Sequence, residues 1–384
     1  MLQRNKDSIK NTFNRILGTE EFYCFAPGRA NIIGEHIDYQ GGTVMPFAID
    51  MGIHFFANYS MDSTTRILSI DLDEEYIYDP NQPPSGWKRF FYDTVSQVQQ
   101  PKSIQIGFGG NLPIGAGLSS SSALVCGIVQ LFDIILGFSS TKEALLNKAI
   151  QIEKGNGLQG GTMDQTAIFF SKAQHAMAFN CSNGARKYIP IPKHWHFYLF
   201  NSGVKHHLVD SEYNTRSLES RIALRQLNHT LGMNYSFLVD VTMAELEKSQ
   251  DNIDAISFKR AKYVIAEQNR VKQTERALQE GNIQLIGTLL NESHHDLRNL
   301  YEVSCSELDW LVEFAQNNLS IAGARMMGGG FGGCTINLTN SELTHDELQM
   351  LKISYFKIFH IHLEVYHVFA SDGMVCYHKI NDPS

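Results

Sequence analysis

A short glycine- and serine-rich segment constrains this sequence more than any other feature. Residues 113–122 read PIGAGLSSSS; they follow an alternating strand pattern at 104–108 and precede an apolar stretch at 122–137 that predicts a buried helix. Glycines let a backbone approach a ligand closely, and the free N–H groups at a helix N-terminus favour an anion. The segment therefore predicts a phosphate-binding loop. A small-residue turn with a serine N-cap is the alternative.

Two better-known phosphate loops do not fit this segment. A P-loop needs a lysine after its last glycine, and no Gly-Lys pair occurs in the chain. The dinucleotide fingerprint needs a third glycine where Ser120 stands. Without a loop lysine, a triphosphate needs another cation, and Mg²⁺ held by a hydroxyl and a carboxylate is the usual solution.

A second segment concentrates ionisable side chains near the N-terminus. Ten consecutive residues carry four of them: Arg29, Glu35, His36 and Asp38. Such a cluster can coordinate a metal, form an acid–base site or bind sugar hydroxyls, which carboxylates accept well. Zinc is disfavoured, because the chain has no H-E-x-x-H motif and the cluster has no companion Cys or His at ligand spacing. A solvated loop with a salt bridge is the alternative.

A second glycine run occupies residues 328–333. It matches G-x-G-x-x-G in spacing, but the residues at 335–338 alternate like a strand instead of opening a helix. We therefore interpret the run as a tight crossing, where the backbone passes close to a ligand or to another element. A purely structural crossing is the alternative.

The later part of the sequence changes from strand patterns to helical ones. Thr242 and Glu245 predict a capping box at a helix start. Alternating apolar residues at 359–365 predict a late strand, and a turn signal precedes another at 374–377. Apolar residues at helical spacing predict three helices, at 216–231, 261–278 and 306–314.

The chain of 384 residues is too long for one compact core, and its composition shifts near Lys193. We predict an N-terminal domain at 1–193 and a C-terminal domain at 194–384. The net charge of −8 argues against nucleic acid or an anionic membrane as the main partner. The N-terminus lacks the apolar core of a signal peptide. Six scattered cysteines without C-x-x-C spacing predict reduced thiols in a cytoplasmic protein.

Taken together, these segments resemble the GHMP small-molecule kinases, and within them the galactokinases. Residues 28–49, GRANIIGEHIDYQGGTVMPFAI, are similar to the galactokinase signature. The segment PIGAGLSSSSA resembles the superfamily's phosphate loop, and MMGGGFGGCT resembles its third motif. Three further stretches fit the same family, at 161–165, 202–216 and 293–309. The resemblance implies an α+β, two-domain GHMP kinase fold with the active site in the inter-domain cleft.

The resemblance also implies an activity. ATP would phosphorylate galactose at the anomeric hydroxyl, giving galactose 1-phosphate and ADP, the first committed step of galactose catabolism. Asp164 would take the proton of that hydroxyl, and Arg29 would neutralise charge on the transferred group. We expect a monomer whose partners are galactose and ATP.

Further residues carry over from the family by position. The sugar pocket would be lined by Glu35, His36, Asp38, Gly161 and Tyr213. The phosphates would be wrapped by Gly115, Ala116, Gly117, Leu118, Ser119, Ser120 and Ser121. Mg²⁺ would be held by Ser121 and Glu153, and Trp87 would lie near the adenine.

The chain departs from the family pattern in two places. The family usually shows Cys-Gly-Ile-Met-Asp, where this chain has Gly-Gly-Thr-Met-Asp at 160–164, beside the second carbon of the sugar. The spacing from Glu153 to Asp164 is also one residue shorter than in the family. The first change puts the tolerance for a substituent on that carbon in doubt, and the second weakens the assignment of Glu153 as a metal ligand.

Two alternatives to galactose phosphorylation remain. The acceptor can be N-acetylgalactosamine, arabinose or galacturonate instead, although Glu35 argues against a uronate because two carboxylates repel. A catalytically inactive sensor that binds sugar and ATP to recruit another protein is the alternative from a different class. The presence of Arg29, Asp164 and the serines at 119–122 argues against it.

Overall fold

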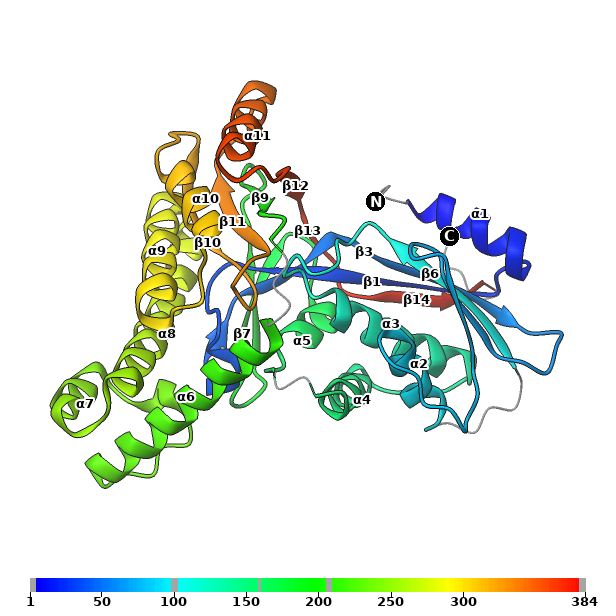
Figure 1. Ribbon diagram of the computed structural model, residues 1–384, viewed down its shortest axis with the longest axis horizontal. Helices are drawn as coiled ribbons and strands as arrows, with labels where there is room; N and C mark the ends of the chain where they lie inside the picture. The colour runs from blue at the N-terminus through cyan, green and yellow to red at the C-terminus, as the bar shows by residue number, and fades with distance from the viewer. Residues whose placement is uncertain (1–4, 98–102, 158–159, 205–208, 380–384) are drawn as a thin grey trace.

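Runs of strands and runs of helices follow one another along the described part of the chain, as expected for an α+β protein (Figure 1). The computed structural model describes residues 5–97, 103–157, 160–204 and 209–379. Up to residue 193 the elements are α1 (Lys6–Leu17), β1 (Phe22–Asn31), β2 (Thr43–Val44), β3 (Pro46–Tyr59), β4 (Arg66–Ser69), β5 (Glu74–Ile77), α2 (Trp87–Val95), β6 (Ile104–Gly110), α3 (Ser120–Ile135), α4 (Lys142–Gly155), α5 (Met163–Phe170), β7 (His175–Asn180) and β8 (Arg186–Pro190). Beyond it they are β9 (His196–Asn201), α6 (Val209–Leu231), α7 (Met243–Lys248), α8 (Ala255–Glu280), α9 (Ile283–Asp296), α10 (Ser306–Gln316), β10 (Ile321–Met326), β11 (Cys334–Thr339), α11 (His345–Phe359), β12 (Glu364–Val368), β13 (Ala370–Ser371) and β14 (Val375–His378).

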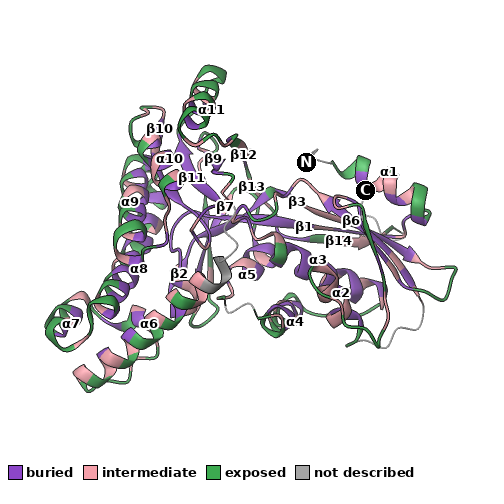
Figure 2. Ribbon diagram, in the orientation of Figure 1, coloured by how far each residue is buried: buried purple, intermediate pink, exposed green. Residues whose placement is uncertain are grey.

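The largest sheet has seven strands and carries the first half of the chain. Its order is β14-β1-β3-β6-β4-β5, with β13 paired to β3. In Figure 1, α1 covers one face and α2, α3, α4 and α5 lie on the other. The apolar helix α3 packs on β1 and β3 so closely that a Cβ at Gly127 would collide with the Phe55 ring. The sheet and α3 form one part of a core that continues into the second half of the chain (Figure 2).

A four-stranded sheet carries the second half, in the order β10-β11-β9-β12. Helices α9 and α10 pack on β10, and Gly287 and Gly323 allow α9 and β10 to touch through their backbones. A small third sheet, β2-β7-β8, joins an early strand to the two strands that precede the predicted boundary. Its strand β2 follows directly on the charged cluster, so this sheet helps to fix the segment that contains Asp38.

The predicted boundary at 193/194 falls between β8 and β9, where the chain passes into the four-stranded sheet. The last strands then return: β13 pairs with β3, and β14 pairs with β1 (Figure 1). We propose that the domain boundary lies at 193/194, with β13 and β14 completing the sheet of the first domain.

Several local predictions are confirmed. The strand at 104–108 is β6, the apolar helix is α3, and the three helices predicted by spacing correspond to α6, α8 and α10. Thr242 and Glu245 form the predicted capping box of α7. The strand predicted at 359–365 is wrong, because α11 continues to Phe359 and His360 ends it in a left-handed conformation. The alternation there spans a helix end, a short connection and the start of β12.

One cysteine pair departs from the prediction of reduced thiols. Cys24 in β1 and Cys376 in β14 are directly paired residues of neighbouring strands and are joined by a disulfide. The prediction was wrong here because 352 positions separate the two residues in sequence, and only the return of β14 brings them together.

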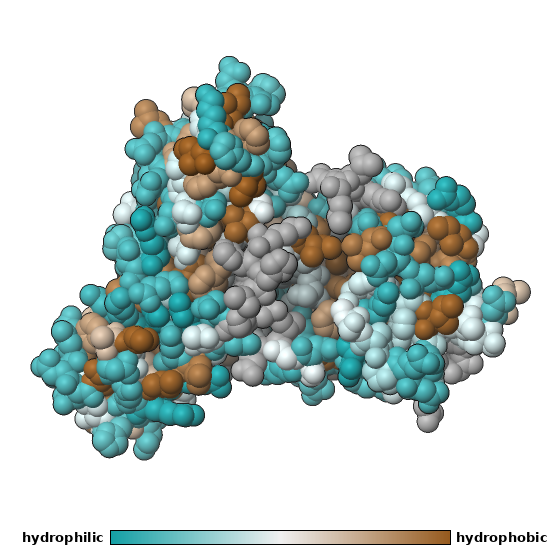
Figure 3. Space-filling view, in the orientation of Figure 1, coloured by the Kyte–Doolittle hydropathy of each residue, from teal (hydrophilic) through white to brown (hydrophobic). Residues whose placement is uncertain are grey.

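Hydrophilic residues predominate on the face shown in Figure 3, and hydrophobic ones are scattered among them, as is normal for a folded protein. None of the helices within the described ranges has both the length and the apolar character needed to cross a bilayer.

Candidate active site

A cavity of about 350 Å³ brings the segments singled out in the sequence together. Sites for small molecules usually measure about 300–1,000 Å³. The walls come from both halves of the chain, since α6 and the second glycine run contribute as well as the N-terminal loops. The predicted site residues that line it are Arg29, Glu35, His36, Asp38, Gly115, Gly117, Leu118, Ser119, Ser120, Ser121, Glu153, Gly161, Asp164 and Tyr213.

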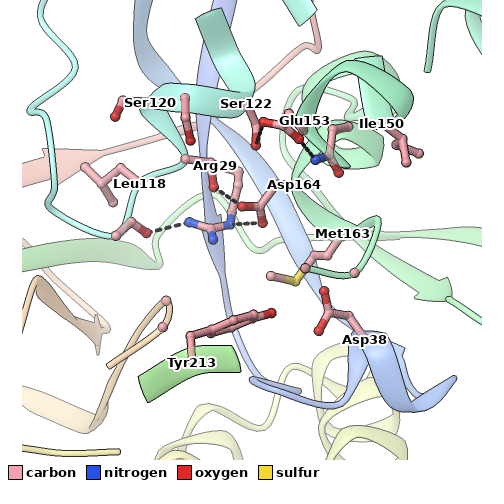
Figure 4. A pocket seen from close by; sticks show the side chains of 18 of the residues that line it. Arg29, Asp38, Leu118, Ser120, Ser122, Ile150, Glu153, Met163, Asp164 and Tyr213 are labelled. Carbon is pink, nitrogen blue, oxygen red and sulfur yellow. Dashed lines mark hydrogen bonds and ion pairs between the residues drawn. The ribbon is translucent and has the colours of Figure 1, made fainter. Parts of the chain in front are cut away.

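The cavity has two ends in Figure 4. Ser120, Ser122 and Glu153 lie at one end, and Asp38 and Tyr213 lie at the other. The pair Arg29 and Asp164 lies between them. The predicted phosphate-binding and sugar-binding residues are therefore separated in space, with the predicted catalytic pair at their boundary.

The glycine- and serine-rich loop leads directly into α3. Gly115 and Gly117 have φ values of 75° and 73°, in the left-handed region that glycine adopts without strain. Ser119 is the N-cap of α3, but its side chain makes no capping hydrogen bond and donates instead to Asp164 Oδ2 at 2.6 Å. The first amides of α3 therefore keep the hydrogen-bonding capacity that an anion uses.

The second glycine run crosses this loop. A Cβ at Gly328 would lie 3.1 Å from the Cα of Gly117, and a Cβ at Gly333 would lie 3.1 Å from the carbonyl oxygen of Ala116. The interpretation as a tight crossing is confirmed. Ala116 is buried at the crossing and is not part of the cavity lining, whereas Gly328 and Gly329 are.

Arg29 and Asp164 form an ion pair (Figure 4). The Nε of Arg29 lies 2.8 Å from Asp164 Oδ1, and its Nη1 donates to the Gly117 carbonyl oxygen at 2.5 Å. Arg29 comes from β1 and Asp164 from the first turn of α5. The Asp164 side chain remains 28% exposed, against 5% for Arg29, so the carboxylate is the member of the pair that a ligand can reach.

Glu35 is held by groups of the protein itself. Its Oε2 lies 2.8 Å from Nη2 of Arg325 and accepts a hydrogen bond from Asn31 Nδ2 at 2.7 Å. Its Oε1 accepts from the Gly328 amide at 2.8 Å. Arg325 comes from β10, is completely buried and also donates to the Ile32 carbonyl oxygen at 2.7 Å. The pair therefore joins the two halves of the chain beneath the cavity.

Asp38 has less compensation. Burial, with contributions from the charges of Asp164 and Glu35, raises its pKa to about 7, and a hydrogen bond from the Tyr39 amide and the charge of Arg29 oppose this rise only in part. A Cβ at Gly161 would overlap the Asp38 carboxyl group, so glycine is needed at that position. The carboxyl group is thus placed where a hydroxyl donor from a ligand would stabilise its charged form.

His36 and Tyr213 form part of an aromatic cluster at the sugar end. Their ring centroids are 5.2 Å apart, and His36 Nδ1 lies 2.9 Å from the Tyr39 hydroxyl. That hydroxyl lies 2.8 Å from the hydroxyl of Tyr301, which ends a π-helical turn at Leu297–Tyr301. Burial lowers the pKa of His36 to about 3, so the ring is neutral. Its Nε2 is buried and makes no hydrogen bond of good geometry with the described residues, although the Gly329 backbone lies close enough to raise the pKa slightly against the effect of burial.

Glu153 lies at the phosphate end on α4. Ser122 Oγ donates to its Oε1 at 2.8 Å, and Gln165 Nε2 donates to its Oε2. Burial raises the pKa of Glu153 to about 7, although both hydrogen bonds oppose the rise. Ser121, the other predicted metal ligand, is exposed at the cavity.

The donor set at this end suits Mg²⁺. A hydroxyl and a carboxylate are the hard oxygen ligands that this ion prefers. Among the described residues that line the cavity, two side chains are cationic, Arg29 and Lys154, and four carry a carboxylate. A triphosphate bound there would be repelled without a further cation.

Trp87 lies outside the lining of the cavity. It begins α2, donates from Nε1 to Glu74 at 3.1 Å and packs edge-on against Phe91 and Phe108, with centroids 5.8 and 5.1 Å away. Its adenine contact stays a prediction.

Sequence reasoning did not find several residues of the site. Lys154 and Asn214 line the cavity, and their only signal is that each neighbours a predicted site residue in sequence. Ser122 and Gln165 hold Glu153. Arg325 had no signal, because it reads as one polar residue at the start of a glycine-rich loop.

Comparisons with known proteins agree with this architecture. Residues 88–172 match the N-terminal domain of GHMP kinases, and residues 274–349 match their C-terminal domain. A solved mevalonate kinase shares the fold, with a TM-score of 0.64 at 15% identity over 91% of this chain and 99% of that one. The two matched domains define a protein of the GHMP kinase class.

Residues 11–59 match the galactokinase galactose-binding signature, and the galactokinase of Glaesserella parasuis is 34% identical over 365 residues, 91% of this chain and 93% of that relative. The chain therefore belongs to the galactokinase family. The galactokinase of Thermotoga maritima is 34% identical over 91% of this chain and 98% of its own. The Lactococcus lactis galactokinase, solved in complex with galactose, has a TM-score of 0.87 at 28% identity, covering 96% of this chain and 99% of that one.

Proposed function

We propose that the chain transfers the γ-phosphoryl group of ATP to the anomeric hydroxyl of galactose, giving galactose 1-phosphate and ADP. The observation that supports this best is the contact among Arg29, Ser119 and Asp164, which joins a carboxylate to the phosphate loop. Membership of the galactokinase family supports galactose as acceptor and ATP as donor.

Asp164 acts as the base. The anomeric oxygen forms a bond to the γ-phosphorus while the bond from that phosphorus to the bridging oxygen of ADP breaks. The proton of the hydroxyl passes to the Asp164 carboxylate late in the transfer, because a loose transition state needs little deprotonation beforehand. Arg29 orients the carboxylate and neutralises charge that develops on the transferred group.

The sugar binds at the end lined by Glu35, His36, Asp38, Gly161 and Tyr213. The buried Nε2 of His36 and the incompletely compensated carboxyl group of Asp38 gain hydrogen-bond partners when a polyol occupies this end. The Gly161 backbone allows Asp38 to approach, and Tyr213 packs over His36. Glu35 keeps Arg325 neutralised beside this end of the cavity.

The triphosphate binds along residues 115–121, with Trp87 proposed near the adenine. Ser121 and Glu153 would hold Mg²⁺, which when bound offsets the charge of the phosphates. Ser122 and Gln165 orient Glu153 for that purpose. Lys154, exposed and next to Glu153 in sequence, adds a second cationic side chain to the cavity lining besides Arg29.

N-acetylgalactosamine is a second candidate acceptor. Gly160 lies where the family has a cysteine, and a Cβ there would meet only the Tyr213 hydroxyl, 3.7 Å away, among the described residues considered. Among the described residues, this wall leaves room for a substituent on the second carbon.

A panel of sugars tests both proposals. Galactose, N-acetylgalactosamine, arabinose, galacturonate and glucose are incubated with ATP and Mg²⁺, and formation of the 1-phosphate is measured. We expect galactose to be turned over fastest. No product with galactose would contradict the proposal, and product with N-acetylgalactosamine would extend it. The monomeric state and cytoplasmic location predicted above stay predictions, and light scattering tests the first.

A further inference from the structure

Two histidines and a glutamate meet on the second sheet, away from the cavity. His196 begins β9, His367 lies in β12, and Glu342 lies in the connection between β11 and α11. One potential ligand atom from each residue lies within 4.8 Å of the others. The described residues contain no second group of this kind. His196 Nδ1 and His367 Nε2 are 3.1 Å apart and share a hydrogen bond, and the two rings are tilted by 48° with centroids 5.1 Å apart.

The separation of the two nitrogens matches that of ligands on one metal ion. Zinc binds imidazole nitrogen at about 2.0–2.1 Å, which in a tetrahedron separates neighbouring ligands by about 3.3 Å. An ion that binds both nitrogens replaces the hydrogen bond between them, with both rings turned toward the ion. Glu342 is exposed, so its carboxylate can turn toward the histidines without disturbing the core.

The scaffold around the histidines is rigid. β9 and β12 are hydrogen-bonded neighbours, and His367 is directly opposite Tyr198, two residues after His196 on the same face of the sheet. The His367 ring stacks on Tyr198, with centroids 4.4 Å apart and an angle of 10°. The Tyr198 hydroxyl accepts a hydrogen bond from the Leu343 amide at 3.0 Å, which fixes the residue after Glu342. A single tyrosine thus positions two of the three groups.

We propose that His196, Glu342 and His367 bind one divalent transition-metal ion, with zinc as the best fit and water completing the coordination. Two imidazoles and a carboxylate select zinc and its neighbours over Mg²⁺, which prefers oxygen ligands. The site is therefore chemically distinct from the magnesium ligands proposed at Ser121 and Glu153.

The position of the site assigns it a structural role. His196 is at the opposite end of β9 from Ser202, whose amide donates to Gly333 at the crossing of the glycine runs. The chain continues from His367 through Phe369, whose amide donates to Asp50 on the first sheet at 3.0 Å. An ion at this site ties the edge strand β12 to β9 close to the point where the chain returns to the first sheet. It stabilises the fold and leaves the reaction unchanged.

Zinc titration of the full chain tests the proposal. The protein is stripped with EDTA, dialysed, and titrated with Zn²⁺ by calorimetry in excess Mg²⁺, which occupies oxygen sites and leaves imidazoles free. We expect one Zn²⁺ per chain for the wild type and for His362→Gln, an exposed histidine just before β12 that serves as the control. His367→Gln and Glu342→Gln should each weaken binding by at least about tenfold, the lower limit even for the loss of an indirect partner.

Two measurements make the result independent of folding defects. Glu342 is exposed, so Glu342→Gln should keep the wild-type circular dichroism and turnover with Mg²⁺. The wild type loaded with Co²⁺ should show the intense visible bands of a four-coordinate site. Absence of Zn²⁺ binding in excess Mg²⁺, equal binding by wild type and Glu342→Gln, or a weak six-coordinate Co²⁺ spectrum would each overturn the proposal.

Discussion

Two neighbouring parts of the cavity wall, here called the anchored end and the open end, differ in how fully their carboxylates are paired with other groups of the protein. At the anchored end, formed by Asn31, Glu35, Arg325 and Gly328, both oxygens of Glu35 have partners from the protein and its charge is balanced by a buried arginine. At the open end, formed by His36, Asp38, Gly161 and Tyr213, burial raises the pKa of Asp38 to about 7 and one nitrogen of His36 makes no hydrogen bond of good geometry with the described residues.

The difference separates scaffold from binding surface, although the two carboxylates are only three residues apart. A buried charge with a full set of partners is already stable, and a ligand can add little to it. A buried polar group without partners costs free energy until something supplies them. The anchored end therefore holds the two halves of the chain together, whereas the open end carries a cost that a bound sugar relieves.

The largest effect is expected at Asp164, which belongs to neither end. Asp164→Asn keeps the size of the side chain but removes the base, so turnover should fall by roughly 10² to 10⁴. Galactose affinity should change little, because other residues bind the sugar and Asp164 serves the chemical step. Steady-state rates and calorimetric titration with galactose measure the two separately. Turnover close to that of the wild type would remove Asp164 from the mechanism.

The next largest effect tests the anchored end. Glu35→Gln leaves Arg325 buried without its counter-charge, and the loss of one partner of a buried pair costs about 3–5 kcal/mol in free energy of unfolding. Urea unfolding measures this cost. The control is the double variant with Arg325→Met, which removes both charges and should recover much of the loss. If Glu35→Gln unfolds like the wild type, the pair does not anchor the wall.

The open end should respond in the opposite direction. The folded-state pKa of Asp38 is about 7, whereas its unfolded value is about 4. Its carboxyl group therefore keeps its proton to a higher pH in the folded protein. Between these values the folded state binds more protons, so the free energy of unfolding falls as pH rises and stays reduced above about pH 7. Asp38→Asn removes this penalty. It should raise stability by roughly 1–3 kcal/mol above pH 7 and change it little near pH 4.

Urea unfolding of the empty protein over this pH range checks the prediction for Asp38→Asn. Burial also raises the pKa of Glu153 to about 7, but that carboxyl group is present in both proteins, so the difference between their pH profiles isolates Asp38. The same variant should bind galactose more weakly. A variant that is less stable than the wild type above pH 7 would show that the open end is scaffold too.

Much of this site could be predicted from the sequence, because its parts are short and continuous. Three segments each carry their chemistry within a few residues: the loop at 113–122, the cluster at 26–39 and the segment at 160–165. The resemblance to a family assigned all three to one site. Strand β6 and helix α3 also follow from local periodicity. The resemblance to a family predicted that these segments line one cavity, and the structure agrees with that prediction.

The anchored end could not be predicted in the same way. Arg325 contacts Glu35 across nearly the whole chain, and nothing in its neighbours distinguishes it from a surface arginine. The bond between Cys24 and Cys376 is equally long-range and depends on the return of β14. Local patterns predict which residues share a helix or a loop. Contacts made by single side chains between distant strands depend on the register of the sheets.

The smallest effect is expected at Ser122, which acts on the phosphate end through Glu153. Ser122→Ala leaves Glu153 with the hydrogen bond from Gln165, so the carboxylate is less well oriented. The Mg²⁺ concentration for half-maximal rate should rise by about 3- to 10-fold. This is at or below the low end of the roughly 10- to 100-fold loss that is usual when an indirect partner of a metal ligand is removed. In a Glu153→Gln background the Ser122→Ala change should have no further effect on the Mg²⁺ requirement, because the carboxylate through which Ser122 acts is already absent. A loss of stability without a change in Mg²⁺ requirement would instead assign Ser122 to the packing of α3 on α4.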